Sequence, residues 1–407
     1  MVSKWTKEQL PNVLIDQKSA IKIGPFGSQL KKELLQKRGN YRVYGQENVY
    51  KNDFSFGDRY LSKEKFEDLK SSEICSNDIV ISTMGTIGQC AIVPRNILPG
   101  IMDSHLIRLR LDNEKVDHLF LKYILQSESI QNQIKKMSVG GIMDGLSTSI
   151  IKQIEISYPS INEQKNIAAT LSDIDQLINS LSELIKKKRL IKKGMTEDLL
   201  IGRKRINNLN NRWSKVVLGD VVRIHRGGSP RPIQNYLTTS SEGINWIKIG
   251  DVGSKDKYIK STSQKITLEG VTSSRRVYKG DFLLSNSMSY GRPYILDING
   301  AIHDGWLVLQ EYNEYFDTDF LYYYLGSDIV LNQYLSKAAG SSVLNLNKEL
   351  VASVEIIKPD ILEQKEIARI LSDMDQEVNK IEEKLEKYKK IKQGMMEQLL
   401  TGKIRLA

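Results

Sequence analysis

The 407-residue chain has few of the features that mark secreted, metal-binding or membrane proteins. Its only cysteines, Cys75 and Cys90, form no Cys-x-x-Cys pair, so neither a disulfide framework nor a structural zinc site is indicated. No apolar stretch reaches the ~18 residues of a membrane span, and the first residues lack the apolar run of a signal peptide. We therefore expect a soluble, reduced, cytoplasmic protein that does not contact a membrane.

Catalytic motifs are also missing. There is no Asn/Asp-Pro-Pro-aromatic run of an amino-methyltransferase and no glycine-rich phosphate loop ending in Lys-Ser/Thr. The four histidines (His105, His118, His225 and His303) do not cluster in the sequence. The sequence Pro-Asp…Glu-x-Lys at 359–365 has the form of a nuclease metal site. However, Asp360 is replaced by Ser160 in a second copy of the motif, which a helix cap tolerates and a metal ligand does not. We expect no catalytic residue, no metal and no cofactor on this chain.

The sequence contains one stretch twice. Residues 161–206 return at 361–406 with 23 of 46 positions identical and a constant offset of 200. The offset persists upstream to residue 120, where Phe-Leu-x-Tyr-x-Leu recurs at 320–325. Before residue 120 the similarity largely disappears. A period of half the chain indicates two tandem units, because a solenoid repeats every few dozen residues.

Each copy of the repeat predicts one long helix, because apolar residues recur at alternating steps of three and four. Ser160 and Asp360 are expected to cap the helix starts, with Glu163 and Glu363 reaching back in a capping box. Gly202 and Gly402 are expected to end the helices. The predicted seam consists of Ile167, Leu171, Ile174, Ile178, Leu181 and Ile185 in the first helix, and of Ile367, Leu371, Met374, Val378, Ile381 and Leu385 in the second.

Two arrangements fit such helices. They could be core helices of compact domains, or they could pair with each other as a coiled coil. Polar residues outnumber apolar ones on most of each helix, which favours mutual pairing. Topology allows either orientation, and the pseudo-twofold duplication favours an antiparallel pair. About 40 residues at ~1.5 Å each would make rods of roughly 60 Å.

The rest of the chain predicts α/β (α+β) globular domains, in tandem by internal duplication. Strands are expected at 41–44, 78–82, 90–93 and 154–158, and a helix at 116–137. The predicted order is a first domain at 1–159, long helix 1 at 160–206, a linker at 207–212, a second domain at 213–359 and long helix 2 at 360–407.

The formal charge of +10 and the pI near 9.2 favour a polyanionic partner, usually nucleic acid. Polar and basic residues gather around glycine-containing turns, where they can reach base edges or phosphates. For each of them an ordinary polar loop residue is the alternative. In the first domain the candidates are Lys22, Ser28, Gln29, Lys31, Gln46, Asn48, Thr83, Thr86 and Gln89. In the second domain they are His225, Arg226, Ser229, Arg231, Ser285, Asn286, Ser287, Tyr290 and Arg292.

A basic run, Lys186-Lys187-Lys188-Arg189 with Lys192-Lys193, lies on the first long helix. It could face DNA phosphates or form a solvated helix surface. The second helix carries Glu382, Glu383 and Glu386 in the corresponding region. This asymmetry argues against an essential contact that both helices share.

The order of these motifs resembles the specificity (S) subunit of type I restriction-modification systems. The residues that carry the resemblance are Pro-x-x-x-Glu-Gln-Lys-x-Ile-Ala at 159–168 and 359–368, and Leu-Leu-x-Gly at 199–202 and 399–402. Further support comes from 23–28 (Ile-Gly-Pro-Phe-Gly-Ser), 85–88 (Gly-Thr-Ile-Gly) and 244–251. The resemblance covers essentially the whole chain.

The resemblance implies two target-recognition domains, each of which reads one half of a split site on double-stranded DNA. It implies that the helices form an antiparallel coiled coil, set the non-specific spacer and dock two methyltransferase subunits. S-adenosylmethionine, ATP and Mg²⁺ are then expected on the methyltransferase and restriction subunits rather than on this chain. Two alternatives remain open: a stand-alone nuclease or recombinase that dimerises through the coil, and a coiled-coil adaptor that does not bind DNA.

Overall fold

The computed structural model describes residues 5–16, 19–138, 145–206, 211–253, 256–286, 291–337 and 346–406. The chain divides into two compact units: Met1–Ser182 with Glu383–Ala407, and Glu183–Glu382. Each unit contains one globular lobe (5–159 or 213–359), the first half of the long helix that follows it and the second half of the other long helix. Most of the predicted linker, 207–210, lies outside the described residues.

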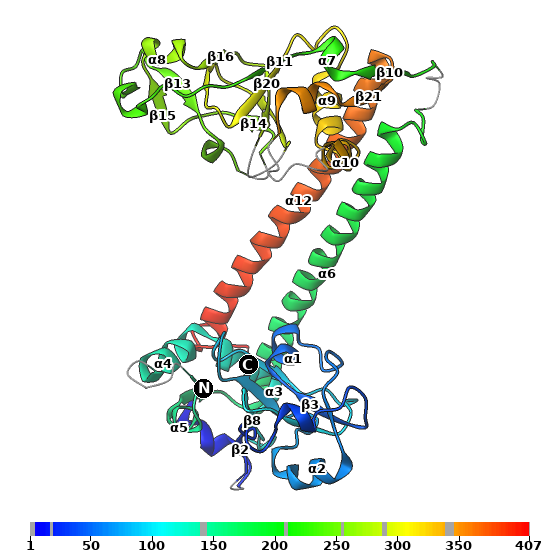
Figure 1. Cartoon of the computed structure of the whole chain (residues 1–407). Helices are drawn as coiled ribbons and strands as arrows, with labels where there is room; N and C mark the ends of the chain where they lie inside the picture. The colour runs from blue at the N-terminus through cyan, green and yellow to red at the C-terminus, as the bar shows by residue number, and fades with distance from the viewer. Residues whose placement is uncertain are drawn as a thin grey trace. The chain divides into compact units, whose positions relative to one another are not determined.

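The first lobe contains three small sheets (Figure 1). One has the strand order β2 (Ile21–Ile23), β8 (Leu106–Leu109), β5 (Ile79–Ser82), β6 (Cys90–Ile92). The second has the order β4 (Tyr60–Leu61), β3 (Tyr41–Tyr44), β7 (Gly100–Met102), with β3 parallel to β7. The third pairs β1 (Thr6–Gln9) with β9 (Glu155–Tyr158), so the two ends of the lobe meet.

The second lobe repeats this frame and extends it. Its first sheet has the order β11 (Arg223–Arg226), β20 (Trp306–Gln310), β17 (Phe282–Ser285), β18 (Pro293–Leu296), β14 (Tyr258–Ile259). Its second has the order β12 (Leu237–Thr238), β15 (Gln264–Ile266), β13 (Ile244–Ile247), β19 (Gly300–Ile302), β16 (Arg275–Val277). The terminal pair is β10 (Ser214–Val217) with β21 (Glu355–Lys358).

The two lobes share their central strands. The antiparallel set β2, β8, β5, β6 corresponds to β11, β20, β17, β18, and the parallel pair β3–β7 corresponds to β13–β19. Strands such as β14 at the edge of one sheet and β12 beside β15 in the other have no partner position in the first lobe. Insertions at sheet edges leave the central hydrogen bonds intact, which explains why the sequences diverge before residue 120 while the frame persists.

The predicted strands of the first lobe are confirmed to within one residue at either end, as β3, β5, β6 and β9. The single helix predicted at 116–137 is wrong: it is two helices, α3 (His118–Gln126) and α4 (Glu128–Ser138). Asp117 caps α3 by accepting the N–H of Phe120, and Ser127 ends α3 in an extended conformation. Two adjacent amphipathic helices share one apolar periodicity, so the break is not visible in the pattern.

Short helices complete both lobes. The first lobe also has α1 (Gln46–Lys51), α2 (Lys63–Asp68), α5 (Thr148–Gln153) and the 3-10 helices η1 (Leu10–Val13), η2 (Lys32–Leu34) and η3 (Lys70–Ser72). The second lobe has α7 (Leu218–Val221), α8 (Leu268–Thr272), α9 (Thr318–Leu325), α10 (Asp328–Lys337), α11 (Lys348–Ala352), η4 (Ile233–Asn235) and η5 (Ile249–Asp251).

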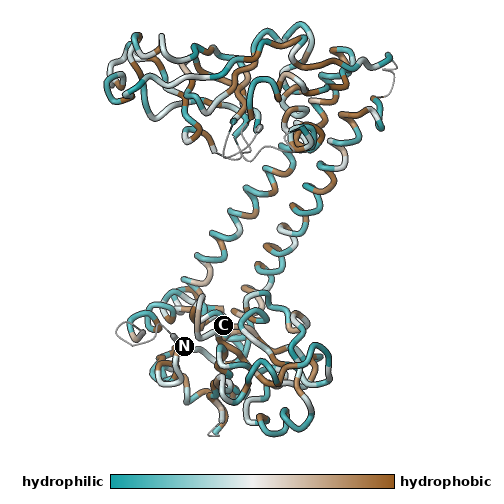
Figure 2. Tube along the Cα trace, viewed as in Figure 1, coloured by the Kyte–Doolittle hydropathy of each residue, from teal (hydrophilic) through white to brown (hydrophobic). Residues whose placement is uncertain are grey.

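The long helices are α6 (Ile161–Leu200) and α12 (Ile361–Leu399). Figure 2 shows hydrophilic and hydrophobic stretches alternating along both. At each N-terminal end the predicted seam residues belong to the core of the lobe: Ile167 and Leu171 in the first, Ile367 and Leu371 in the second. Leu181, Ile185 and Val378 continue the buried stripe along the helices. No helix in the described parts of the chain is both long and apolar enough to cross a bilayer.

The helices pair antiparallel in both units. In the first unit Asp175 of α6 binds Lys392 of α12 at 2.7 Å, and Glu163 binds Arg405 beyond the end of α12. In the second unit Asp375 of α12 binds Lys192 of α6. Glu363, near the start of α12, binds Arg205, which follows the end of α6. In both cases an early residue of one helix contacts a late residue of the other. The long helices are therefore an antiparallel coiled coil, as predicted.

A tyrosine joins each lobe to this helix pair. The Tyr123 hydroxyl of α3 donates to Asp175 at 2.8 Å, and the Tyr323 hydroxyl of α9 donates to Asp375 at 2.8 Å. The same carboxylates bind Lys392 and Lys192. Asp175 therefore connects α3, α6 and α12, and Asp375 connects α9, α12 and α6. Burial is the main reason that the pKa of both tyrosines is raised, so both stay protonated donors.

The repeated Glu-Gln pair does not form the predicted capping box. Glu163 is buried and accepts bonds from Arg405 Nε at 2.6 Å and a terminal nitrogen at 2.7 Å. Glu363 is buried and binds Arg205, and it also accepts the Trp213 indole N–H at 2.7 Å. A carboxylate held bidentately by the guanidinium of an arginine that follows the other helix cannot also reach back to the helix start. Asp360 caps as predicted, accepting the N–H groups of residues 362 and 363.

The neighbouring glutamines are fully buried and fully bonded. Gln164 accepts the N–H of Asp117 at 2.9 Å and donates to two backbone carbonyls, both at 3.0 Å. Gln364 makes the same three bonds, beginning with the N–H of Asp317 at 2.8 Å. Each glutamine therefore fixes the start of a long helix to the start of the lobe helix α3 or α9.

Glycines end both long helices, as the sequence predicted. Gly202 has φ +77° and Gly402 has φ +71°, the left-handed conformation that side chains rarely adopt. The N–H two residues further on bonds back into the last turn, at 3.1 Å in both copies. A Cβ at either position would also lie in tight contact with an indole ring, 3.1 Å from Trp213 at Gly202 or 3.0 Å from Trp5 at Gly402, so that the ring would have to shift slightly. The glycines thus stop the helices and seat the first aromatic residue of each lobe.

Candidate nucleic-acid interface

Both lobes hold one loop in the same hydrogen-bond frame, loop 82–89 in the first and loop 285–292 in the second. In each, the N–H of the first residue donates to the carbonyl of the last, at 2.8 and 3.2 Å. The glycine before the last residue, Gly88 or Gly291, donates to the first carbonyl at 3.1 and 2.8 Å and has a positive φ. The described ends of the two loops are therefore equivalent, although the loop sequences share only a serine and this glycine.

Three predicted DNA-binding side chains in these loops are buried. Thr83 is 4%, Ser285 0% and Asn286 6% exposed. The Asn286 amide donates to the Asp304 carbonyl at 2.9 Å, and the Ser285 hydroxyl accepts the N–H of Arg292. These side chains support the loops from inside, so we leave them out of the proposed surface. A sequence pattern places a polar residue on a turn without showing which way it faces.

Thr86 and Gln89 are exposed on loop 82–89, where their side chains are free to meet a ligand. Tyr50 of α1 fixes this loop, because its hydroxyl donates to the Met84 carbonyl at 2.8 Å and accepts the Thr86 N–H at 3.2 Å. Of the corresponding residues in loop 285–292, Ser287 and Tyr290 lie outside the described residues.

The basic turn after β11 is organised by Asp304, which the sequence analysis missed. Arg226 donates Nε to the Asp304 carbonyl at 3.2 Å, and the Ser229 hydroxyl donates to its carboxylate at 3.0 Å. Arg231 lies 3.6 Å from the same carboxylate with 81% of its side chain exposed, and His303 lies 2.9 Å away. Arg226 and Arg231 are therefore oriented yet open to solvent, whereas Ser229 serves the turn itself.

His225 lies on β11 and is half-buried. Burial lowers its pKa, and the positive charges of Arg275, Lys348 and Arg223 lower it further. The imidazole is therefore neutral near pH 7, where it can donate or accept a hydrogen bond but adds no charge for a phosphate.

The matching turn of the first lobe carries the predicted residues Lys22, Ser28, Gln29 and Lys31. Lys22 lies on β2 and is half-buried, and the other three are exposed. The Gln29 N–H donates to the Phe26 carbonyl at 2.8 Å, which closes the turn. Phe26 projects with 62% of its surface exposed, so this turn offers an apolar tip beside polar side chains.

One glycine in each turn allows a close backbone contact. A Cβ on Gly24 would lie 1.9 Å from the Asp103 carbonyl oxygen, and a Cβ on Gly227 would lie 2.2 Å from that of His303. The turns are thereby clamped to equivalent points, 103 and 303, of the two lobes. In the first lobe Arg59 binds the Asp103 carboxylate at 2.9 Å. The sequence alone does not mark these two positions, because the similarity between the halves largely disappears before residue 120.

Gln46 and Asn48 both lie on α1 but differ in burial and in hydrogen bonding. Gln46 is half-buried, with its side-chain oxygen 3.4 Å from the Tyr50 hydroxyl. Asn48 is 3% exposed; its oxygen accepts the Gly45 N–H, and its amide donates to the carbonyls of Asp53 and Phe56. All of its polar atoms are used within the loop, so we also leave Asn48 out of the proposed surface.

The basic run on α6 is largely neutralised by ion pairs. Lys188 binds Glu377 at 2.6 Å and Arg189 binds Glu382, both on α12. Lys186 pairs with Glu183 at 2.7 Å within its own helix, and Lys193 pairs with Asp328 of α10 at 2.7 Å. The main role of the basic run seen in this structure is therefore to form ion pairs within the second unit.

The acidic residues at 359–365 are engaged in structural contacts. Asp360 accepts two backbone N–H groups and the Asn211 amide, and these bonds hold its pKa below the usual range. Glu363 is bound by Arg205 and Trp213. Among the residues that the structure describes, no group of three His, Cys, Asp or Glu side chains could hold a metal ion.

A family model described as the type I restriction modification DNA specificity domain matches residues 22–190 and 210–393, most of the chain in two copies. The chain belongs to this family. A Methanocaldococcus jannaschii protein whose name places it among type I restriction enzyme specificity subunits, MjaX, is 26% identical over 369 residues, covering 85% of this chain and 83% of the relative. The type I restriction enzyme MjaVIII specificity subunit of the same organism is 25% identical over 330 residues and covers 75% of each chain.

Solved structures of the type I specificity family share the fold. The S subunit of a type I restriction-modification system from M. genitalium superposes with a TM-score of 0.56 at 19% identity, covering 97% of this chain and 96% of that one. A chain from a structure on assembly and conformational transition of the type I system gives a TM-score of 0.61 at 17% identity, covering 97% of both. The tandem α+β lobes and the long helix pair are thus the fold of the family.

Proposed function

We propose that this chain is the subunit that recognises the DNA sequence for a type I restriction-modification complex, with each lobe reading one half of a split site. The observation that carries the proposal is the equivalence of loops 82–89 and 285–292. Their ends are held by the same backbone hydrogen bonds, while six of the eight residues differ between them, among them the exposed Thr86 and Gln89 of the first loop. A constant frame with variable side chains suits two readers of different base sequences.

We further propose that catalysis belongs to the partner subunits. This chain would bind double-stranded DNA and two methyltransferase subunits, one for each pseudo-equivalent half, and restriction subunits through the complex. S-adenosylmethionine, ATP and Mg²⁺ would be bound by those partners in the cytoplasm. In support, the acidic residues that most resembled a metal site are already bonded to N–H, amide and guanidinium groups of the chain itself.

Methylation of the whole genome tests the recognition role. Deleting the gene should abolish methylation at one bipartite motif, and returning the unaltered chain should restore it. Restoring it with Gln89→Ala should change the bases accepted in one half-site only, because Gln89 belongs to one lobe. Lys186→Ala, in an exposed intrahelical pair, is the matched control and should restore the original motif. Unchanged methylation in the deletion strain would reject the function.

The spacer between half-sites tests the role of the coiled coil. Seven residues inserted into α6 after Ser182 and seven into α12 after Glu382 would lengthen both helices by ~10 Å and keep the apolar repeat in phase. We expect the methylated motif to gain about three base pairs of spacer, or methylation to be lost. Methylation of the original motif at its original spacing would show that the helices do not set the distance.

The two alternatives make different predictions. A stand-alone nuclease or recombinase would cut or join DNA as purified chain with Mg²⁺ alone. A coiled-coil adaptor would bind its partner without competition from duplex DNA and without the steep salt dependence of phosphate binding. A pull-down that recovers a methyltransferase subunit, followed by salt-sensitive binding of duplex DNA, supports the proposal over both.

A further inference from the structure

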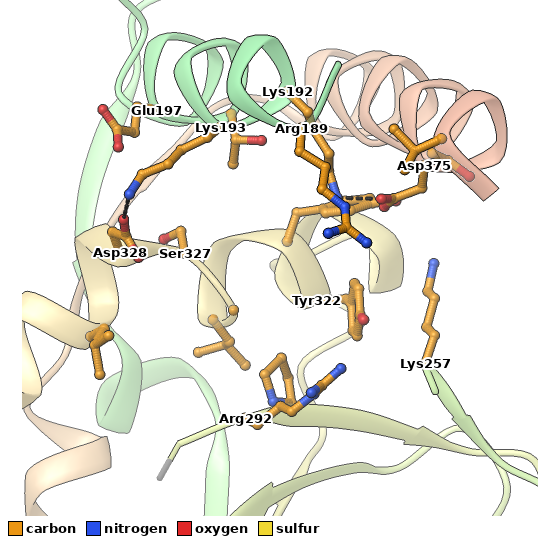
Figure 3. Close-up of a pocket in the computed structure, with 18 of the residues that line it drawn as sticks. Arg189, Lys192, Lys193, Glu197, Lys257, Arg292, Tyr322, Ser327, Asp328 and Asp375 are labelled. Atoms are coloured by element: carbon orange, nitrogen blue, oxygen red, sulfur yellow. Dashed lines mark hydrogen bonds and ion pairs between the residues drawn. The ribbon is translucent and has the colours of Figure 1, made fainter. Parts of the chain in front are cut away.

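A cleft of about 800 Å³ lies in the second unit, between the lobe helices α9 and α10 and the long-helix pair. Figure 3 shows Arg189 from α6, Lys257 and Arg292 arranged around Tyr322 in this cleft. The lysines that α6 contributes to the cleft are paired with acids: Lys192 with Asp375, and Lys193 with Asp328 at 2.7 Å. These pairs belong to the packing of the unit and leave little charge for a ligand.

Arg292 differs from the other cations that line the cleft in having no acidic partner among the described residues. It is half-buried, and its guanidinium lies 5.5 Å from the Tyr294 ring centroid, yet within the described residues it makes no ion pair. Lys257, on the other side of Tyr322, binds Asp319 at 2.7 Å with its ammonium 4.9 Å from the Tyr322 ring. A half-buried guanidinium without a carboxylate is partly desolvated and uncompensated, so the site favours an added anion.

At the corresponding place the first unit has a cation on a different element, and this cation too has no ion pair in the part of the chain that the structure describes. The loop frames equate Arg292 with Gln89, and the offset of 200 equates Tyr322 of α9 with Lys122 of α3. Lys122 is half-buried and lies 5.9 Å from the Tyr123 ring, again without an ion pair among the described residues. Loop and helix are adjacent in this lobe too, because the Cys90 thiol lies 3.6 Å from the Lys122 carbonyl.

The second lobe has Arg292 and Tyr322 where the first lobe has Gln89 and Lys122. Each pair carries one positive charge, but the charge sits on a different element and presents its hydrogen-bond donors in a different geometry. Base recognition requires donors at fixed angles, whereas a phosphate tolerates a cation presented from either neighbour. The group that is common to two different half-sites is the sugar-phosphate backbone. We propose that Arg292 in the second lobe and Lys122 in the first each bind a phosphodiester of the DNA backbone, so that Arg292 positions the duplex rather than reading a base. This inference rests on the proposed function.

Salt titration of binding tests it, with the full chain assembled with its methyltransferase subunits and a duplex carrying the methylated motif. Arg292→Gln should weaken binding roughly fivefold to tenfold at 0.1 M salt and make the slope of log K against log salt less steep by about 0.9. The double variant Arg292→Gln/Tyr322→Lys recreates the first-lobe arrangement and should restore the slope. The reciprocal variants test the first lobe. Lys122→Tyr should make the slope of log K against log salt less steep by the same amount, and the double variant Lys122→Tyr/Gln89→Arg should restore it.

A panel of duplexes with each base of the second half-site changed in turn separates positioning from reading. A phosphate contact predicts that Arg292→Gln weakens all of them by the same factor. A loss confined to one base, with no rescue by Tyr322→Lys, would overturn the inference. Thermal melting of each variant monitors folding, and if Tyr322→Lys fails to fold, the Lys122 pair decides the question.

A small phosphorylated ligand is the competing source of the anion. Thermal shift with inorganic phosphate or ATP distinguishes it. Stabilisation of the unaltered chain at micromolar concentration, lost in Arg292→Gln while DNA binding is unchanged, would assign the cleft to such a ligand and reject the phosphodiester. If the unaltered complex binds no DNA at any salt concentration, the proposed function itself fails, and that result differs from a selective change in slope.

Discussion

The helix junctions of the two units are nearly identical, whereas their sheets and loops are not. Gln164 and Gln364 make equivalent sets of three hydrogen bonds, and Asp175 and Asp375 each bind one tyrosine and one lysine at equivalent positions. The second lobe nevertheless has extra edge strands and a different set of outward polar residues. Buried polar contacts permit few substitutions because each unpaired group costs free energy, and exposed loops carry no such constraint.

The largest effect is expected at the buried glutamines. Gln164→Leu or Gln364→Leu removes three hydrogen bonds and leaves an N–H and two carbonyls unsatisfied, so each should lower the free energy of unfolding by about 3 kcal/mol. Urea unfolding of the full chain measures the loss. Equal effects would confirm that the junctions are equivalent, and a loss below about 1 kcal/mol in either would show that its junction is dispensable.

The second largest change in the free energy of unfolding is expected at Glu163, and it should depend on pH. Hydrogen bonds from Arg405 are the main reason that the pKa of Glu163 is lowered. A lowered folded-state pKa stabilises the fold above the ordinary glutamate value of about 4.3, and this stabilisation is lost as the pH falls through the folded-state pKa. Glu163→Gln should therefore destabilise the chain by about 2 kcal/mol at pH 7.

The matching measurement is unfolding of Glu163→Gln and the unaltered chain between pH 3 and pH 7. The difference between the two should shrink as the pH falls below the ordinary glutamate value and through the lowered folded-state pKa, where the native carboxylate becomes protonated. A difference that stays constant across this range would mean that charge does not contribute to the Glu163–Arg405 contact.

The tyrosines that join lobe and coil should have a smaller effect. Tyr123→Phe and Tyr323→Phe keep the ring and remove only the hydroxyl that donates to Asp175 or Asp375, so each should cost about 1–2 kcal/mol. Thermal unfolding compares the pair under one condition. Because the two bonds have the same length, unequal losses would show that the surroundings of the two junctions differ.

The smallest effect is expected on the exposed surface of α6. Lys186→Ala breaks an exposed pair with Glu183, which is worth less than about 0.5 kcal/mol. Its unfolding midpoint should match that of the unaltered chain. A large loss would mean that the basic run carries a contact beyond the ion pairs seen in this unit.

Much of the fold could be predicted because it depends on local periodicity. The doubled apolar repeat, the glycine at each helix end and the central strands are properties of short segments. The break between α3 and α4 was missed because the apolar period continues across Ser127. The candidate interface was predicted less well, since Thr83 and Asn48 turn inward.

By itself, the sequence determined that the molecule is built twice on the same pattern and that each copy ends in a long amphipathic helix, because such features are written in spacing and identity along the chain. Only the tertiary structure decided which polar residues are buried and with whom they pair. Glu163 meets Arg405, and Asp175 meets Lys392, across more than 200 positions of sequence. Their chemistry depends on that approach, because a carboxylate caps, binds a cation or stays solvated according to what the rest of the chain brings within hydrogen-bonding distance.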